Sequence, residues 1–197
     1  YCVRKKKLFR LILVILLAIQ FHTSAFVLAL LYPMYHAKIT KRWLWIVVPC
    51  MAAVYVFKTE LFRFLMAFLW KDYSDISETG ATTVLMLLII FGVYCYVIPA
   101  EKDLDQDTVA MRNILLCSIT LQFFAMLHPL AMRINYYLLL FVPILIPRIA
   151  NRSKEKYAQI AKLSEVVMTV YFFYYFLSNG IRDNDKFMIF PYIPFWE

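Results

Sequence analysis

The chain of 197 residues is 63% hydrophobic and only 17% charged, with a mean hydropathy of +0.67. Soluble domains are usually about half apolar and about a quarter charged, so this composition excludes an ordinary soluble domain and indicates an integral membrane protein. The net charge of +8 lies in short basic clusters between apolar segments. That arrangement follows the positive-inside rule and does not indicate a nucleic-acid partner.

Seven apolar stretches, separated by polar or basic joints, follow one another along the chain. They cover residues 8–20, 22–36, 43–57, 81–99, 112–127, 134–149 and 163–178. Most are slightly shorter than the ~20 residues that cross a hydrocarbon core as a helix, and flanking Trp, Tyr, Lys and Arg side chains can make up the difference. We therefore expect an all-α fold, a polytopic transmembrane helical bundle of about seven spans. Residues 1–197 are expected to form one integral membrane domain.

The first two stretches admit two interpretations, because beyond Arg10 only positions 20 and 22–24 interrupt the apolar run within residues 8–35. One interpretation is a single long tilted helix. The other is a tight hairpin. The polar cluster at the midpoint favours the hairpin, and so do the basic clusters at both ends, since a single span would place one of those clusters outside.

Residues 58–80 form the longest joint in the chain. Its apolar residues recur at helical spacing beside three basic residues: Leu61, Phe62, Phe64, Leu65, Phe68 and Leu69, with Lys58, Arg63 and Lys71. This pattern predicts a short amphipathic helix in the plane of the membrane surface, which either anchors the fold or covers a site. Two prolines, Pro49 and Pro143, lie inside apolar stretches and are expected to permit kinks.

The orientation follows from the basic residues of alternating joints. With the N-terminus inside, the inner joints (Arg112 among them) hold 15 lysines and arginines, and the outer joints hold 6. The positive-inside rule therefore predicts a cytoplasmic N-terminus and an external C-terminus. In this orientation His22, residues 58–80 and the turn before Arg133 all lie at the outer face.

The cysteines and glycines exclude several kinds of site. Cys2, Cys50, Cys95 and Cys117 lack metal-ligand spacing, and three of them lie inside apolar stretches, where a thiol behaves as a small apolar group. With only three glycines, the chain has no phosphate-binding loop, and it carries no hydrolase or metalloprotease motif. We expect no disulfide, no metal site and no cofactor.

Arg133 is the first candidate for chemistry, because it opens the sixth stretch after the turn that contains His128 and Pro129. A guanidinium group donates paired hydrogen bonds to phosphate or pyrophosphate oxygens. The alternative is that Arg133 reaches lipid headgroups and anchors the helix. Tyr136 and Tyr137 follow it and could stack on sugar rings, or could belong to an interfacial aromatic belt.

His22 is the second candidate, with Ser24 two residues further on. At the outer turn of a hairpin this histidine could act as a general base or could orient a sugar hydroxyl. The alternative is a hydrogen-bonded polar turn without a chemical role. His128 could take the same part as His22, or could cap the turn beside Pro129.

Three short motifs, in order along the chain, resemble the EpsG family of membrane proteins, which are relatives of Wzy-type polysaccharide polymerases. Residues 20–25, QFHTSA, are similar to the family's FHxSA motif, and residues 132–137, MRINYY, are similar to its R-x-x-Y-Y/F motif. Residues 190–197, FPYIPFWE, resemble its PY-x-FFW ending. Because family members are longer and the sequence begins at Tyr1, we expect the chain to be the C-terminal portion of such a protein.

The resemblance implies a metal-independent glycosyl transfer at the outer face of the bacterial cytoplasmic membrane. Lipid-pyrophosphate-linked oligosaccharide repeat units would be joined into a surface, capsular or exopolysaccharide, with release of polyprenyl pyrophosphate. Arg133 would hold the pyrophosphate and His22 would deprotonate or orient the acceptor hydroxyl. Further substrate-binding residues would be Ser24, Arg63, His128, Tyr136 and Tyr137. The implied partners are the polyprenyl-pyrophosphate-linked oligosaccharide, the lipid bilayer and other proteins of polysaccharide export or chain-length control.

Two other functions are compatible with the sequence. An O-antigen-ligase-like glycosyltransferase would use the same donor with a different acceptor. A non-catalytic lipid or oligosaccharide transporter would hold charged or polar residues near the middle of its spans. The predicted spans are almost free of charge and the candidate residues gather at one face, which favours an interfacial enzyme.

Overall fold

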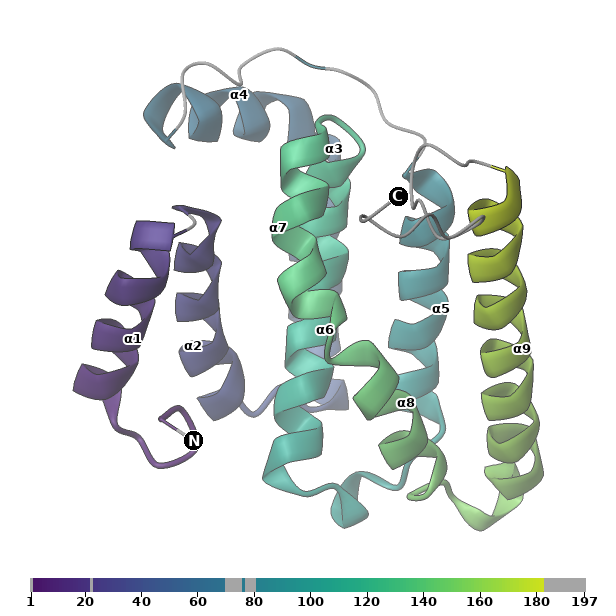
Figure 1. Ribbon diagram of the computed structural model, residues 1–197. Coiled ribbons are helices and arrows are strands. Elements are labelled where there is room, and N and C mark those ends of the chain that lie inside the picture. The colour runs from purple at the N-terminus through teal and green to yellow at the C-terminus, as the bar shows by residue number, and fades with distance from the viewer. Residues whose placement is uncertain (1, 22, 70–75, 77–80, 183–197) are drawn as a thin grey trace, which may run out of the picture.

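The computed structural model describes residues 2–21, 23–69, 76 and 81–182, and these residues form helices joined by short connections (Figure 1). In chain order, with η for 3-10 helices, the elements are α1 (Leu8–Phe21), η1 (Thr23–Leu30), α2 (Leu31–His36), η2 (Lys41–Trp43), α3 (Leu44–Val56), α4 (Lys58–Leu69), α5 (Thr82–Val97), η4 (Glu101–Asp103), α6 (Gln106–Ala125), α7 (Pro129–Leu139), α8 (Val142–Ala150), η5 (Glu155–Tyr157) and α9 (Ala158–Arg182). The all-α expectation is confirmed for this part of the chain.

The helices run up and down between the two ends of the molecule (Figure 1). α1 contacts η1, and the segment η1–α2 runs back beside α1 as the second arm of a hairpin (Figure 1). The single long helix is thereby excluded. α4 lies across one end of the bundle and runs from the end of α3 toward the side of the α1–α2 hairpin (Figure 1). This is the segment, residues 58–80, for which the sequence predicts a helix parallel to the membrane surface.

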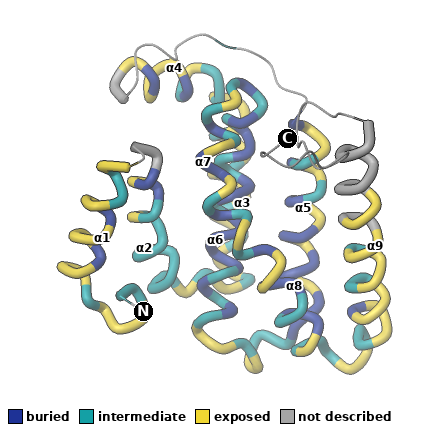
Figure 2. The backbone as a smooth tube through the Cα atoms, in the orientation of Figure 1, coloured by how far each residue is buried: buried dark blue, intermediate teal, exposed yellow. Residues whose placement is uncertain are grey.

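α6 is the central helix and the most deeply buried one (Figure 2). It packs against α2, α3, α5, α7 and α8. The main core lies where α5, α6 and α8 meet, around the fully covered side chains of Cys95, Leu115, Leu145 and Ile149. In a bilayer the lipid chains are as apolar as this core, so it is the close packing of these side chains that holds the helices together.

Many apolar side chains point away from this core. On α9, for example, Leu163, Val166, Val167 and Val170 are each more than half exposed. Apolar surface of this extent is unfavourable in water, but it suits a helix that faces hydrocarbon. The outward faces of the helices are therefore those of a membrane protein.

Judged by the length and composition of the described helices, the structure has fewer candidate membrane spans than the seven that the apolar stretches predict. One described helix, α6, is long and apolar enough to cross a membrane alone. Two bent pairs pass the same test only together: Ala25–His36 with Lys41–Val56, bent by 118°, and Pro129–Leu139 with Val142–Ala150, bent by 43°. That gives up to three spans among the residues described, and the figure of seven stays a prediction.

The break between α7 and α8 has a physical cause in the sequence. Pro143 has no backbone N–H and its ring clashes with the carbonyl four residues earlier, which favours a break or kink at this point. α7 ends at Leu139 and α8 begins at Val142. The kink expected at Pro143 is thus confirmed, whereas the helix α3 runs through Pro49 from Leu44 to Val56.

Candidate functional site at the start of α7

The start of α7 is fixed by local chemistry. His128 has extended backbone geometry and is the N-cap residue, and its Nδ1 accepts a hydrogen bond from the Leu130 backbone N–H at 3.0 Å. Pro129 occupies the first turn, where a missing N–H costs nothing. Of the two roles that the sequence leaves open for His128, the structure shows the cap, and its part in substrate binding stays a prediction. The cap places Arg133 in the second turn of α7.

A chain of buried amides attaches α7 to α6. Ser118 Oγ donates to Asn135 Oδ1 at 2.7 Å, and Asn135 Nδ2 donates to Gln122 Oε1 at 2.8 Å. Gln122 Nε2 then donates to the Ala81 carbonyl at 3.2 Å, just before α5. These three side chains are fully buried, where an unpaired amide would be costly, so the network fixes the rotation of α7 about its axis.

Arg133 and Tyr136 lie on the opposite, outward side of α7. Both are exposed, as is Leu140 one turn further on. Within the described part of the chain no carboxylate forms an ion pair with Arg133, so its guanidinium group is available to an external anion. Tyr137 is half-buried and lies on a different side of the helix.

α4 lies beside this end of α7, and one of its contacts is an aromatic one with the cap residue His128. The Phe62 and His128 rings stack with centroids 5.9 Å apart and planes 26° apart. Phe62 is almost completely buried, and it packs with Met66 and Leu127. Arg63, the next residue on α4, is exposed. The structure thus brings α4 and His128 together.

The position of the N-terminal hairpin also matters, because it carries the other sequence candidates. η1 contacts α7, and its residues Ala25 and Val27 are buried. Ser24 lies within η1. His22 is outside the described residues, so its placement relative to Arg133 stays a prediction. The backbone that follows His22 nevertheless reaches the helix that carries Arg133.

Arg112 is the main polar residue that sequence reasoning placed wrongly. Counted there as a charge in an inner joint, it lies in the second turn of α6 and is completely buried. Its guanidinium group donates to Glu101 Oε1 at 2.7 Å and to the Ile39 carbonyl at 2.9 Å, and it lies 4.1 Å from the centre of the Tyr96 ring. The signal available in the sequence was an arginine that begins an apolar stretch near an acidic joint.

Asp105 lies beside this cluster, at the end of α6 remote from Arg133. It accepts a hydrogen bond from Thr108 and forms ion pairs with Arg152 at 3.0 Å and Arg148 at 3.6 Å. Partial burial opposes ionisation, but the hydrogen bond and the two arginines outweigh it and lower the pKa of Asp105. These contacts connect the start of α6 to the connection after α8.

An apolar cavity of about 520 Å³ lies between α5, α8 and α9. Leu88, Phe91, Pro143 and Ile146 are among its apolar lining residues. Glu165 is the one ionisable side chain in the described lining, and it lies inside the seventh apolar stretch of the sequence. A carboxylate in such a stretch is itself a signal of function. Arg133 does not line this cavity, although Arg133 and several of the lining residues belong to the same broken span of α7 and α8.

The described residues contain no group of three or more His, Cys, Asp or Glu side chains arranged to hold a metal ion. The arrangement at the start of α7 is instead a cation with aromatic neighbours. Such an arrangement is chemically able to bind an anion through the guanidinium group, next to rings that can stack on a sugar.

Comparison with known proteins supports the resemblance seen in the motifs. The chain matches the EpsG family over residues 1–193, which is almost its full length. No curated protein and no solved structure matches it. Because the family match covers nearly the whole chain, the protein belongs to the EpsG family, which is linked to exopolysaccharide biosynthesis.

Proposed function

We propose that this chain polymerises exopolysaccharide from lipid-pyrophosphate-linked oligosaccharide repeat units at the outer face of the bacterial cytoplasmic membrane. The acceptor hydroxyl oxygen forms a bond to the anomeric carbon of the donor, and the bond from that carbon to the pyrophosphate oxygen breaks. The hydroxyl proton passes to His22. The electron pair of the broken bond leaves with polyprenyl pyrophosphate.

The exposed guanidinium group of Arg133 is the observation that carries this proposal. It has no ion-pair partner among the described residues, and the buried Asn135 keeps the Arg133 side of α7 turned outward. A donor pyrophosphate gains negative charge as the glycosidic bond breaks. A fixed cation at that position stabilises the transition state more than the bound donor, and so increases the rate.

Two features around Arg133 suit the rest of the donor. Tyr136 is 54% exposed on the same side of α7, which allows its ring to stack on a sugar. The apolar cavity of about 520 Å³ lies beside α8, the second half of the same broken span. Its size is within the usual range for ligand pockets, and its lining suits an isoprenoid chain.

The test is polymer length in cells that depend on this protein. We expect Arg133→Ala to abolish the long-polymer ladder on gels while single repeat units persist, and Arg133→Lys to restore it only in part, because an ammonium group cannot form the paired contact. Arg10→Ala is the matched control, since Arg10 is another exposed helical arginine. A normal ladder from Arg133→Ala, with membrane insertion confirmed, contradicts the proposal.

The same assay separates polymerisation from the alternatives. A ligase-like enzyme would attach one donor to a different acceptor, so its loss would leave long polymer on the lipid carrier. A transporter would leave unpolymerised repeat units on the inner face when it is lost. Single repeat units that accumulate at the outer face identify the polymerase.

A further inference from the structure

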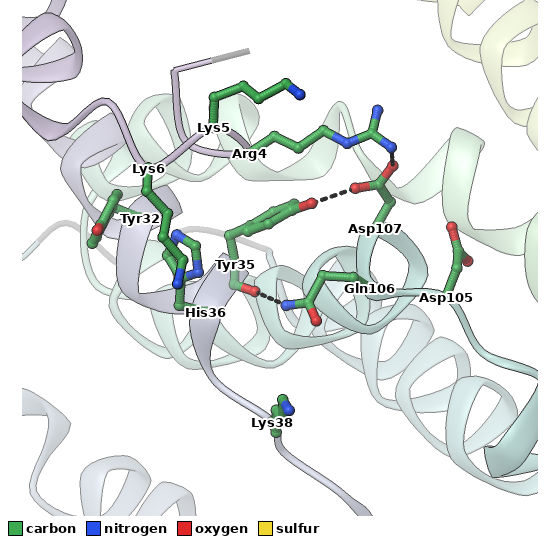
Figure 3. A pocket seen from close by; sticks show the side chains of 10 residues that line it. All are labelled: Arg4, Lys5, Lys6, Tyr32, Tyr35, His36, Lys38, Asp105, Gln106 and Asp107. Atoms are coloured by element: carbon green, nitrogen blue, oxygen red, sulfur yellow. Dashed lines mark hydrogen bonds and ion pairs between the residues drawn. The ribbon is translucent and has the colours of Figure 1, made fainter.

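A second, polar cavity of about 1070 Å³ lies at the end of the bundle remote from Arg133. Figure 3 shows the side chains that line it, which come from the segment before α1, from α2 and the connection after it, and from Asp105 and the first residues of α6. α6 has 20 residues, so its two ends are about 30 Å apart at 1.5 Å per residue. The cavity is therefore distinct from the candidate site.

The charges around this cavity do not cancel. Its two carboxylates already have partners: Asp107 pairs with Arg4 at 3.6 Å and accepts from the Tyr35 hydroxyl at 2.6 Å, while Asp105 pairs with Arg152 and Arg148. By contrast, Lys5, Lys6 and Lys38 line the cavity, are exposed, and have no ion-pair partner in the described part of the chain. Three uncompensated ammonium groups therefore surround the space.

The walls of the cavity are held in place by direct contacts. Gln106 Nε2 donates to the Tyr35 carbonyl at 2.6 Å, and the His36 ring lies 3.2 Å from the Val3 carbonyl and packs edge-on against Tyr35 (Figure 3). Tyr32 packs on the other side of that ring. The aromatic wall is thus built independently of the lysines, which leaves the lysines able to contact a ligand.

From this arrangement we propose that the cavity binds the phosphate group of an anionic ligand, through Lys5, Lys6 and Lys38. The positive-inside rule assigns this end of the bundle to the cytoplasm, where both anionic phospholipid headgroups and soluble phosphate esters are present. A phosphate monoester accepts hydrogen bonds from several ammonium groups at once. The bound phosphate would connect the segment before α1, which carries Lys5 and Lys6, to the segment after α2, which carries Lys38.

The experiment uses the full chain in phosphatidylcholine nanodiscs and two probes that carry the same phosphate. Dioctanoyl phosphatidic acid represents the headgroup of a lipid, and glycerol 3-phosphate represents a soluble ester. Binding is measured by titration calorimetry for the unaltered chain and for the triple variant Lys5→Gln, Lys6→Gln, Lys38→Gln. The matched control is Lys102→Gln, Lys156→Gln, Lys162→Gln, which removes the same charge from exposed lysines outside the cavity.

We expect the cavity triple variant to weaken binding by about a hundredfold, from the usual contribution of each lysine near an anionic phosphate, and the control triple to leave it nearly unchanged. The probe that binds identifies the source: phosphatidic acid alone indicates a lipid, and glycerol 3-phosphate as well indicates a soluble ester. The proposal is overturned if the two triple variants weaken probe binding equally, or if neither probe binds to the unaltered chain.

A single substitution keeps the test valid if the triple variant does not fold. Asp107→Asn keeps a side chain that can accept the Tyr35 hydrogen bond but releases Arg4 and removes a negative charge from the lining. The proposal requires tighter binding of the probe in this variant. Unchanged or weaker binding contradicts it.

Discussion

Asn135 Nδ2 donates to Gln122 Oε1 at 2.8 Å, between α7 and α6, with both side chains completely buried. Asn135 lies two positions after Arg133, which on a helix puts the two side chains on nearly opposite sides. The hydrogen bond that points inward therefore determines which way Arg133 points. The core of the bundle and the candidate site are connected through this one residue.

Replacing Asn135 with Leu should destabilise the fold by about 1–3 kcal/mol, because Gln122 and Ser118 then lose their partners in a buried site. The free energy of unfolding, measured in detergent micelles, checks this value. Polymer made by cells should also be shorter, since α7 is free to rotate and Arg133 is less well placed.

A double-mutant cycle measures the interaction between Asn135 and Gln122 apart from the effect of losing either side chain alone. Gln122→Leu alone should also be destabilising, but the double replacement of Gln122 and Asn135 should cost less than the sum of the two single ones, because no amide is left facing an unpaired partner. Strict additivity contradicts a direct interaction between the two side chains.

Phe62 is expected to hold α4 on the bundle through its contact with His128. Phe62→Ala should cost about 3 kcal/mol, the usual price of removing a buried aromatic ring, and should increase hydrogen exchange in α4. Phe64→Ala is the matched control on the same helix, because Phe64 is 71% exposed. Comparable exchange in the two variants argues against Phe62 as the attachment point.

Removal of Glu101 and removal of Arg112 should have unequal effects. Glu101→Ala leaves a completely buried guanidinium group without its counter-charge, which should cost about 3 kcal/mol. Arg112→Met replaces the cation by an apolar chain and leaves Glu101, which is 35% exposed, able to reach solvent. The smaller loss is therefore expected for Arg112→Met in unfolding measurements, and the reverse order would show that Arg112 is not buried as described.

Asp105 should give a pH dependence of stability with a defined direction. The hydrogen bond from Thr108 and the two arginines hold the pKa of Asp105 below its ordinary value of 3.8 in the folded chain, so the unfolded chain binds the proton first as pH falls. The stabilisation is complete above 3.8 and is lost below it. The difference in melting temperature between the unaltered chain and Asp105→Asn should shrink as pH falls below 3.8. A difference that is independent of pH contradicts ionic pairing of Asp105 with Arg152.

The sequence predicts the local elements of this fold well, because each rests on neighbouring residues. The hairpin follows from polar positions 22–24 between apolar runs, α4 from its amphipathic spacing, and the break before α8 from Pro143. The lengths of the helices cannot be predicted from the lengths of the apolar stretches in the same way. α1 has 14 residues and α3 has 13, because apolar residues also occupy the connections.

Long-range polar contacts could not be predicted. The burial of Arg112 depends on the Ile39 carbonyl, 73 positions away, and on Glu101 in the preceding joint. Within the candidate site, the outward position of Arg133 and the capping role of His128 agree with their places in the sequence. The role of Asn135 in orienting α7 could not be predicted, because it depends on contacts that form only when α7 packs on α6.

The most direct test of the central claim is the release of polyprenyl pyrophosphate by purified protein in liposomes supplied with lipid-pyrophosphate-linked repeat units. The account predicts one polyprenyl pyrophosphate for each new sugar linkage, with the rate reduced about a hundredfold or more by Arg133→Ala and unchanged by Arg10→Ala. If no polyprenyl pyrophosphate appears while the intact lipid-linked oligosaccharide crosses the bilayer, the protein is a transporter and the proposed polymerase is contradicted.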